Sequence, residues 1–339
     1  MLQAMWGRLV VSVPMRLVQE WPPVARVALA VVVAIAVATP FLALGSGGVA
    51  RASDGPLPVP YSAAAGIAAE LTSPGSAPPG ANDWSCKPSA AHPDPVILVH
   101  GFLANMTVNW QTMAPLLANN GYCVFALNYG AIPGLGFPLD QAGGLLPMDQ
   151  SAKALGAFVD RVLAATGASK VDIVGHSEGG TMPYYYVKFL GGDAKVDRYV
   201  GLASVYHGTN LDGGAPLLTA LARLFPTGSQ LVAQSCGACQ EFLPGSGFLD
   251  GLDPDGAAVS GVTFTNITSR LDEVVVPYTS GFLSGPNVTN LVVQDQCGLD
   301  LSDHVALVAD PIAGQDVLNA LDPAHAVAPT CQVVLPFVG

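Results

Sequence analysis

Strand-length stretches rich in apolar residues, of which 96–99 is an unbroken run, alternate with amphipathic stretches over most of the chain after residue 95. Each apolar run has the length of a strand that is buried on both faces, and each amphipathic stretch has the period of a helix that covers a sheet. The pattern predicts strands at 96–99, 122–127, 170–174, 196–202, 262–267 and 288–293, and helices at 110–119, 151–165, 181–190 and 311–321. Such alternation is typical of an α/β fold with a mostly parallel central sheet and helices on both faces.

The N-terminal segment has a different composition from the rest of the chain. Residues 1–52 contain four arginines and one glutamate, and an apolar run from Val27 to Leu44 precedes Ala50-Arg51-Ala52. A basic flank, an apolar core and a small-residue cleavage site together predict a secretory signal peptide. The alternative is an uncleaved membrane anchor at residues 27–44, because this run is close to the shortest length that spans a bilayer. Both interpretations place the bulk of the protein outside the cytoplasm.

The remaining sequence divides into an arm and one domain. Residues 53–92 are rich in Pro, Gly, Ser and Ala, which predicts an irregular N-terminal arm. Regular patterning begins near Pro95, so we expect a single catalytic domain at 93–339. Two apolar segments outside the main pattern, 131–147 and 211–252, either form a lid over a substrate site or pack on the sheet.

Composition and charge exclude several classes of protein. Half of the 339 residues are hydrophobic, which excludes a disordered chain. The formal net charge is −12, and because residues 1–52 carry +3, the remainder carries −15. With no basic stripe to neutralise phosphates, we expect no nucleic-acid partner.

The six cysteines suit an oxidising compartment. Cys236 and Cys239 form a C-x-x-C pair, but no second ligand pair suggests zinc and no strand precedes it as in a redox motif, so we expect a local disulfide. For the others we expect Cys86–Cys123 and Cys297–Cys331. Each pair would close a loop of about 35 residues, worth about 4 kcal/mol in the chain-entropy model.

The strongest chemical signal follows the third predicted strand. Gly175-His176-Ser177-Glu178-Gly179 joins that strand directly to a predicted helix. In this strand–turn–helix context, G-x-S-x-G indicates a nucleophilic serine held on a sharp turn, with glycines where side chains would collide. Ser177 is therefore the candidate nucleophile.

A serine nucleophile needs a histidine base and an orienting acid, which follow it in the chain in this architecture. Of the six histidines, His304 lies on the loop between the last strand and the last helix, where the base is expected, whereas His207 comes early and His176 adjoins the nucleophile. Asp272 directly follows the fifth predicted strand and is the candidate acid. Its main rival is Glu273, and Asp300 and Asp303 are weaker ones.

The oxyanion of an acyl-transfer intermediate requires two backbone N–H donors. One is expected from the residue after the nucleophile, Glu178. The other is expected from the loop after the first strand, His100-Gly101-Phe102-Leu103, where Phe102 is our candidate.

Several segments together resemble the secreted bacterial class 2 lipases of the α/β-hydrolase superfamily. They span most of residues 84–331 and include 95–101, 121–130, 170–192, 207–209, 272–280 and 288–290. The resemblance implies an α/β-hydrolase fold and an extracellular triacylglycerol lipase or carboxylesterase that needs no cofactor. It also implies a triad of Ser177, Asp272 and His304, and a lipid or other apolar ester as substrate, met at a lipid–water interface.

One residue departs from the family pattern, which often has Gln after the nucleophile where this chain has Glu178. A carboxylate there is unhelpful beside an oxyanion unless it points away or is protonated. If charged, it could raise the pKa of His304, in which case Glu178→Gln would move the acidic limb of the pH–rate profile downward.

Two other functions stay open. One is an acyltransferase or polyester depolymerase on the same scaffold, and the other is a catalytically silent surface protein tethered by residues 27–44. The acids Asp250, Asp253 and Asp255 partly match a calcium loop, but Gly251 occupies its first ligand position and no Glu closes it, so we expect a solvated turn and no metal.

Overall fold

The computed structural model of the protein describes residues 55–134, 136–209, 236–256 and 258–339. Residues 53–339 form one compact unit, separate from residues 1–52. The predicted signal peptide therefore lies outside the described residues, as does 211–235 of the second candidate lid segment. Among the helices that are described, none has both the length and the hydropathy needed to cross a membrane.

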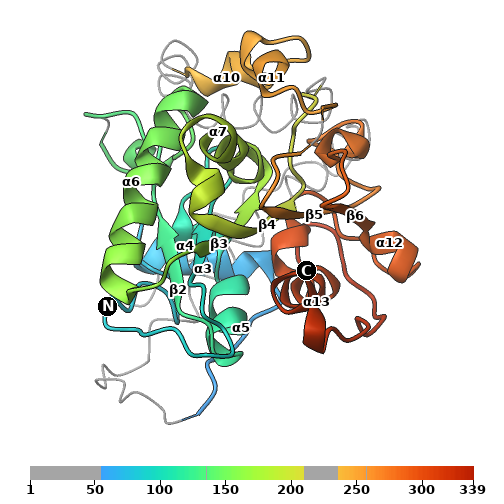
Figure 1. Cartoon of the computed structure of the whole chain (residues 1–339). Helices are drawn as coiled ribbons and strands as arrows, with labels where there is room; N and C mark the ends of the chain where they lie inside the picture. Colours follow the sequence, from blue (N-terminus) through green and yellow to red (C-terminus); the bar gives the residue numbers. More distant parts are fainter. Residues whose placement is uncertain (1–54, 135, 210–235, 257) are drawn as a thin grey trace, which may run out of the picture. The chain divides into compact units, whose positions relative to one another are not determined.

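Six strands form one parallel sheet in the order β2-β1-β3-β4-β5-β6 (Figure 1). This confirms the predicted α/β class and all six predicted strands. β3 runs to the residue before Ser177, and the last predicted strand gives way to a short helix at its final residue. The strands are β1 (Val96–Val99), β2 (Val124–Leu127), β3 (Val171–His176), β4 (Val196–Leu202), β5 (Thr263–Thr268) and β6 (Val288–Val292).

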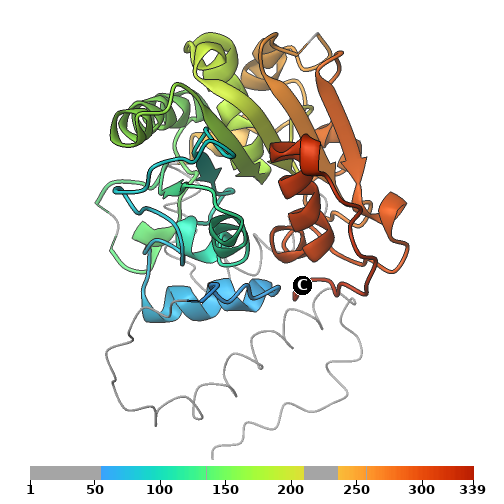
Figure 2. The same ribbon diagram turned by 60° about the horizontal axis from the view of Figure 1, so that its bottom comes forward.

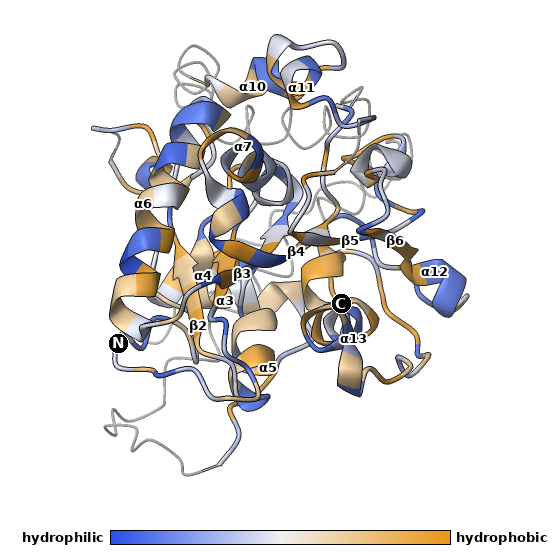
Figure 3. Ribbon diagram, viewed as in Figure 1, coloured by the Kyte–Doolittle hydropathy of each residue, from blue (hydrophilic) through white to orange (hydrophobic). Residues whose placement is uncertain are grey.

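Successive strand residues point to opposite faces, and both faces are covered by helices. Ile97 and Val99 join the core cluster that includes residues of α6 (Met148–Thr166) and α7 (Met182–Phe189). Val96 and Leu98 join the cluster that includes residues of α5 (Met113–Asn119) and α13 (Pro311–Leu321). The hydropathy colouring agrees with this, since β2 and β3 are largely hydrophobic and hydrophobic and hydrophilic colours alternate along α6 (Figure 3).

The helix boundaries follow local chemistry. α6 ends at Gly167, whose φ of +79° suits glycine, and Asp310 caps α13 by accepting a hydrogen bond from the N–H of Ile312. α5 begins later than predicted because Pro115 is tolerated only in the first turn of a helix. The other α-helices described are α3 (Ala63–Thr72), α4 (Met106–Asn109), α10 (Ala238–Glu241), α11 (Gly247–Leu252) and α12 (Val293–Gln296).

The expected irregular arm is partly wrong, because residues Ala63–Thr72 form helix α3. Five alanines favour a helix there, and the flanking Pro and Gly residues hid this signal. The helix is packed closely, since a Cβ on Gly66 would overlap the backbone carbonyl of Val108. α3 lies beside the C-terminal residues, where the N–H of Ala63 donates to the carbonyl of Val338 (Figure 2).

The sheet order reverses direction at β1, since β2 lies on one side of β1 and β3 on the other. Val99, the last residue of β1, pairs with Gly175 near the end of β3. The loops that leave these two strands therefore start side by side at the carboxyl edge of the sheet, the place where open α/β sheets build their sites.

All three expected disulfides are present in the structure: Cys86–Cys123, Cys236–Cys239 and Cys297–Cys331. The first ties the chain before β1 to the start of β2. The last joins the segment after α12 to the C-terminal residues, and His304 lies in the loop that it closes.

Candidate active site

Ser177 begins the short turn that follows β3 and is 8% exposed. Its φ is +57°, a left-handed conformation that is strained for any residue with a side chain. The turn is so tight that a Cβ on Gly175 would overlap the carbonyl oxygen of Gly179, and a Cβ on Gly179 would overlap that of Val99. The glycines of the motif are therefore required by sterics.

His304 and Asp272 form a buried pair. Nδ1 of His304 lies 2.8 Å from Oδ2 of Asp272, and since a carboxylate can only accept, Nδ1 carries the hydrogen. The other oxygen, Oδ1, accepts from the N–H groups of Val274 at 2.9 Å and Val275 at 2.7 Å. This arrangement fixes the ring and makes Nε2 the nitrogen that can exchange a proton with a reacting group.

His176 brings the His304 loop to the nucleophile turn. The rings of His176 and His304 are 4.8 Å apart, and Nε2 of His176 lies 3.1 Å from the carbonyl oxygen of His304. Asn109 of α4 completes the link, because its Oδ1 is 3.1 Å from Nδ1 of His176 and accepts from the N–H of Gly101. No sequence motif marks Asn109, and only packing shows its place.

The charges around His304 favour its protonated form. Burial of the ring lowers its pKa, but the negative charges of Asp272, Glu273 and Asp303 outweigh burial and raise the pKa of His304 above its ordinary value. Glu273 also accepts from the His304 N–H, at 3.3 Å. Of the four acids weighed from the sequence, Asp272 is the one whose carboxyl reaches the ring nitrogen.

The loop after β1 leaves one amide available. The N–H of Gly101 donates to Asn109 and that of Leu103 donates to the carbonyl of Gly143, at 2.9 Å. The amide of Phe102 between them has no hydrogen-bond partner in the part of the chain that the structure describes. The loop also approaches the turn closely, since a Cβ on Gly101 would lie 3.2 Å from Cβ of Ser177. These are the properties expected of an oxyanion donor.

The C-terminal residues hold the His304 loop in place. Besides the Cys297–Cys331 bond, the N–H of Leu301 donates to the carbonyl of Val334 at 3.0 Å, and the N–H of Phe337 donates to Oδ2 of Asp303 at 2.9 Å. The loop is thus fastened on both sides of Ser302, shortly before the candidate base.

Glu178 points into the protein and is fully buried. The hydroxyl of Tyr129 lies beside the Glu178 carboxyl and donates to the carbonyl of His100 at 2.8 Å. Burial first, and then the negative charge of Glu241, raise the pKa of Glu178 well above its ordinary value. Burial therefore favours the protonated form of this carboxyl, one of the alternatives that the sequence leaves open for Glu178.

We expect Glu178→Gln to change stability with pH and to leave the acidic limb of activity in place. At low pH the carboxyl is protonated in both states; as pH rises past about 4.5 only the unfolded chain ionises, so the parent loses stability. Over this interval the free energy of unfolding of the parent falls by about 1.4 kcal/mol per pH unit. Urea unfolding between pH 4 and pH 8 should therefore show a variant-minus-parent difference that grows with pH. A difference that stays flat, as expected for exposed Asp193→Asn, would contradict this account.

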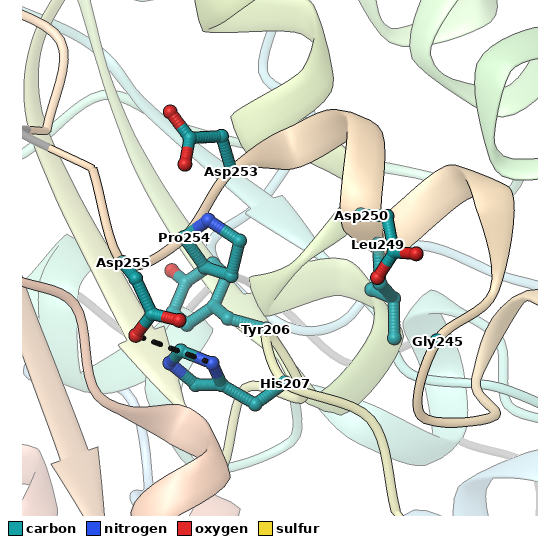
Figure 4. A pocket seen from close by; sticks show the side chains of 8 residues that line it. All are labelled: Tyr206, His207, Gly245, Leu249, Asp250, Asp253, Pro254 and Asp255. Atoms are coloured by element: carbon teal, nitrogen blue, oxygen red, sulfur yellow. Dashed lines mark ion pairs between the residues drawn. The ribbon is translucent and has the colours of Figure 1, made fainter.

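A separate cavity of about 280 Å³ lies beyond β4, lined by Tyr206, His207, Leu249 and the acidic turn (Figure 4). Nδ1 of His207 faces Oδ1 of Asp255 at 3.8 Å, and its Nε2 lies 3.1 Å from the carbonyl of Phe282. Asp253 and Asp255 are largely exposed, as a solvated turn should be. His207 is thus placed with this turn and not with Asp272.

A six-stranded parallel sheet with flanking helices, and a serine on a tight strand–turn–helix junction, define an α/β hydrolase. Within that class, the chain belongs to the class 2 lipase family. The model of this family, described as Lipase (class 2), matches residues 93–316.

Two relatives that bear the name of a lipase match only part of the chain. Triacylglycerol lipases of Pseudarthrobacter phenanthrenivorans and Burkholderia plantarii are each 38% identical to it over 96 residues, which is 27% of this chain. The chain thus matches about a quarter of their length, 27% and 24% respectively. Among solved structures, Aspergillus fumigatus lipase B is similar with a TM-score of 0.54 at 19% identity, over 74% of this chain and 61% of that one, which shows the fold alone.

Proposed function

We propose that the protein is a serine hydrolase that cleaves carboxylic esters of lipids, as a triacylglycerol lipase or carboxylesterase. The observation that carries this proposal is the buried Asp272–His304 pair beside the strained Ser177 turn. Family membership and the triacylglycerol lipases among the relatives favour the same reaction class.

In the proposed reaction, His304 takes the proton of the Ser177 hydroxyl through Nε2, and the serine oxygen attacks the ester carbonyl. The amides of Phe102 and Glu178 hold the oxyanion, while Asp272 keeps the imidazole in one tautomer. His304 then protonates the departing alcohol. Water repeats the attack on the acyl-enzyme, releasing the acid and restoring Ser177.

An apolar acyl group suits the surroundings of the loop after β1. Phe102 and Phe242 lie edge to face at 5.3 Å, so two aromatic rings border the proposed oxyanion donor. In the candidate lid segment 131–147, Leu145 is fully buried whereas Phe137 is 67% exposed. The C-terminal part of this segment therefore packs on the core, whereas its middle presents an apolar side chain to solvent.

Covalent labelling tests the chemistry, and an acyl series tests the substrate class. A fluorophosphonate should label the intact protein once, and peptide mass spectrometry should place the label on Ser177. Unlabelled protein with native unfolding behaviour would support the silent surface protein instead.

Esters from acetate to palmitate should be hydrolysed with a preference for apolar acyl groups, and a preference for charged or sugar esters would contradict the lipid proposal. Product analysis with glycerol or a polyester film separates hydrolase from acyltransferase or depolymerase.

We also propose that the protein acts outside the cytoplasm after removal of residues 1–52. Its three disulfides are the supporting feature, since such bonds persist in oxidising compartments. Sequencing the N-terminus of the exported protein tests this, and retention of residues 27–44 would favour the anchor.

A further inference from the structure

Two buried aspartates face each other beneath the His304 loop. Asp300, four residues before His304, is 1% exposed, and Asp310 at the start of α13 is fully buried. Oδ1 of Asp310 is occupied by the N–H of Ile312 at 2.7 Å. Oδ2 of Asp300 is buried with no hydrogen-bond partner among the described residues. Two such groups are costly to bury as charges, so their protons need to be accounted for.

The hydroxyl of Ser302 lies between the two carboxyls. Its Oγ is 2.6 Å from Oδ1 of Asp300 and 3.1 Å from Oδ2 of Asp310. The Ser302 N–H also donates to the same Asp300 oxygen, at 2.7 Å, which marks Asp300 as the acceptor. A hydroxyl has one hydrogen to donate. If it goes to Asp300, the contact with Asp310 is a hydrogen bond only when Asp310 brings a proton of its own.

We propose that Asp310, Ser302 and Asp300 share one proton, and that this proton fixes the loop that carries His304. This inference rests on the proposed role of His304 as the base. The three are positioning residues, because they act through the loop and not on the substrate. The link extends to the acid of the site, since the carbonyl of Ser302 accepts from the hydroxyl of Ser269, three residues before Asp272. Loss of the proton would set two carboxylates against a single hydroxyl and loosen residues 300–304.

Burial and nearby negative charge favour the protonated form of Asp310. Burial, followed by the charge of Asp300, raises the pKa of Asp310 to about 8. On the loop, Asp303 accepts from the N–H groups of Ala306 and Phe337. Asp316 of α13 accepts from Gln296 of α12. From the β5 side, Asp272 and Glu273 face His304.

The decisive variant is Asp310→Asn, which imitates a permanently protonated carboxyl. Its amide can donate to Ser302 through Nδ2 and still accept from Ile312 through Oδ1. The parent should lose ester hydrolysis above about pH 8, and this alkaline limb should move upward by at least one pH unit in Asp310→Asn. Asp310→Ala, which cannot donate, should lower kcat about tenfold or more at every pH, with KM little changed.

The matched control is Asp316→Asn, which removes another buried carboxyl from the same helix. It should keep the alkaline limb of the parent. An equal limb in Asp310→Asn and Asp316→Asn would overturn the proposal, because the shift would then not depend on the shared proton.

Two measurements decide the proposal without relying on turnover. Carboxyl ¹³C signals of labelled aspartate should show one group titrating near pH 8 in the parent that is missing in Asp310→Asn. The ring signals of His304 should move in the same pH interval in the parent only. If no variant hydrolyses esters, the proposed function fails while these spectra still test the network. Titration of Asp310 below pH 5, or His304 signals that do not follow it, would overturn the inference.

Discussion

Ser177→Ala should lower the hydrolysis of a p-nitrophenyl ester by about 10⁵-fold, with folding unchanged. The substitution removes the one oxygen that the turn presents beside the His304 loop, and alanine accepts the backbone conformation about as well as serine does. The residual rate comes from the oxyanion donors and from binding alone. Initial rates measured below the alkaline limb of the parent, with the active sites of the parent titrated by fluorophosphonate, give the ratio.

Ser151→Ala is the matched control for this prediction. Ser151 is buried in α6, and its hydroxyl has no hydrogen-bond partner among the described residues. Ser151→Ala thus also removes a buried serine hydroxyl, but from a position outside the turn. The rate of ester hydrolysis should stay within a factor of two of the parent. Ser177→Ala that hydrolyses the ester at the parental rate would overturn the assignment of the nucleophile.

Gly175→Ala should destabilise the protein by more than about 4 kcal/mol, or prevent it from folding. A methyl group at this position would overlap the carbonyl oxygen of Gly179. Because that oxygen belongs to the backbone, no side-chain rotation relieves the overlap, and the β3 turn must open. Opening the turn also displaces Ser177, so labelling of any folded fraction should be lost. Thermal unfolding and fluorophosphonate labelling measure the two effects.

Gly251→Ala provides the comparison. Gly251 is exposed in α11, and an added Cβ would meet nothing within 4 Å. Alanine should stabilise the helix slightly, by up to about 1 kcal/mol. If Gly175→Ala also unfolds at the temperature of the parent, the prediction is contradicted, and the turn tolerates a methyl group that its geometry excludes.

The sequence predicts most strongly where local pattern and local chemistry coincide. β1, β2 and β3 are buried along their whole length, and β1 and β2 read as unbroken apolar runs, whereas Thr289 and Asn290 of the edge strand β6 are exposed. Ser177 can be proposed from the sequence because its steric demands dictate its neighbours. His304 and Asp272 can be proposed from chain order, since each follows a predicted strand of the sheet.

The remaining parts depend on contacts between distant segments. Helix α3 was hidden by its Pro and Gly flanks, and Asn109 connects the turns after β1 and β3 from a four-residue helix with no motif of its own. Asp300 and Asp303 read as loop acids and yet prove buried. Burial also favours one of the two charge states that the sequence leaves open for Glu178, because that state depends on packing that no local pattern encodes.

The fastening of the His304 loop by residues 331–337 has a consequence for biosynthesis. A polypeptide emerges from its N-terminus, so the Ser177 turn is made roughly 150 residues before the segment that secures the candidate base. Ser177 therefore leaves the ribosome well before residues 331–337, which fasten the His304 loop, have been synthesised. On the proposed function, the base would be held in place only once residues 331–337 and the Cys297–Cys331 bond have joined the fold.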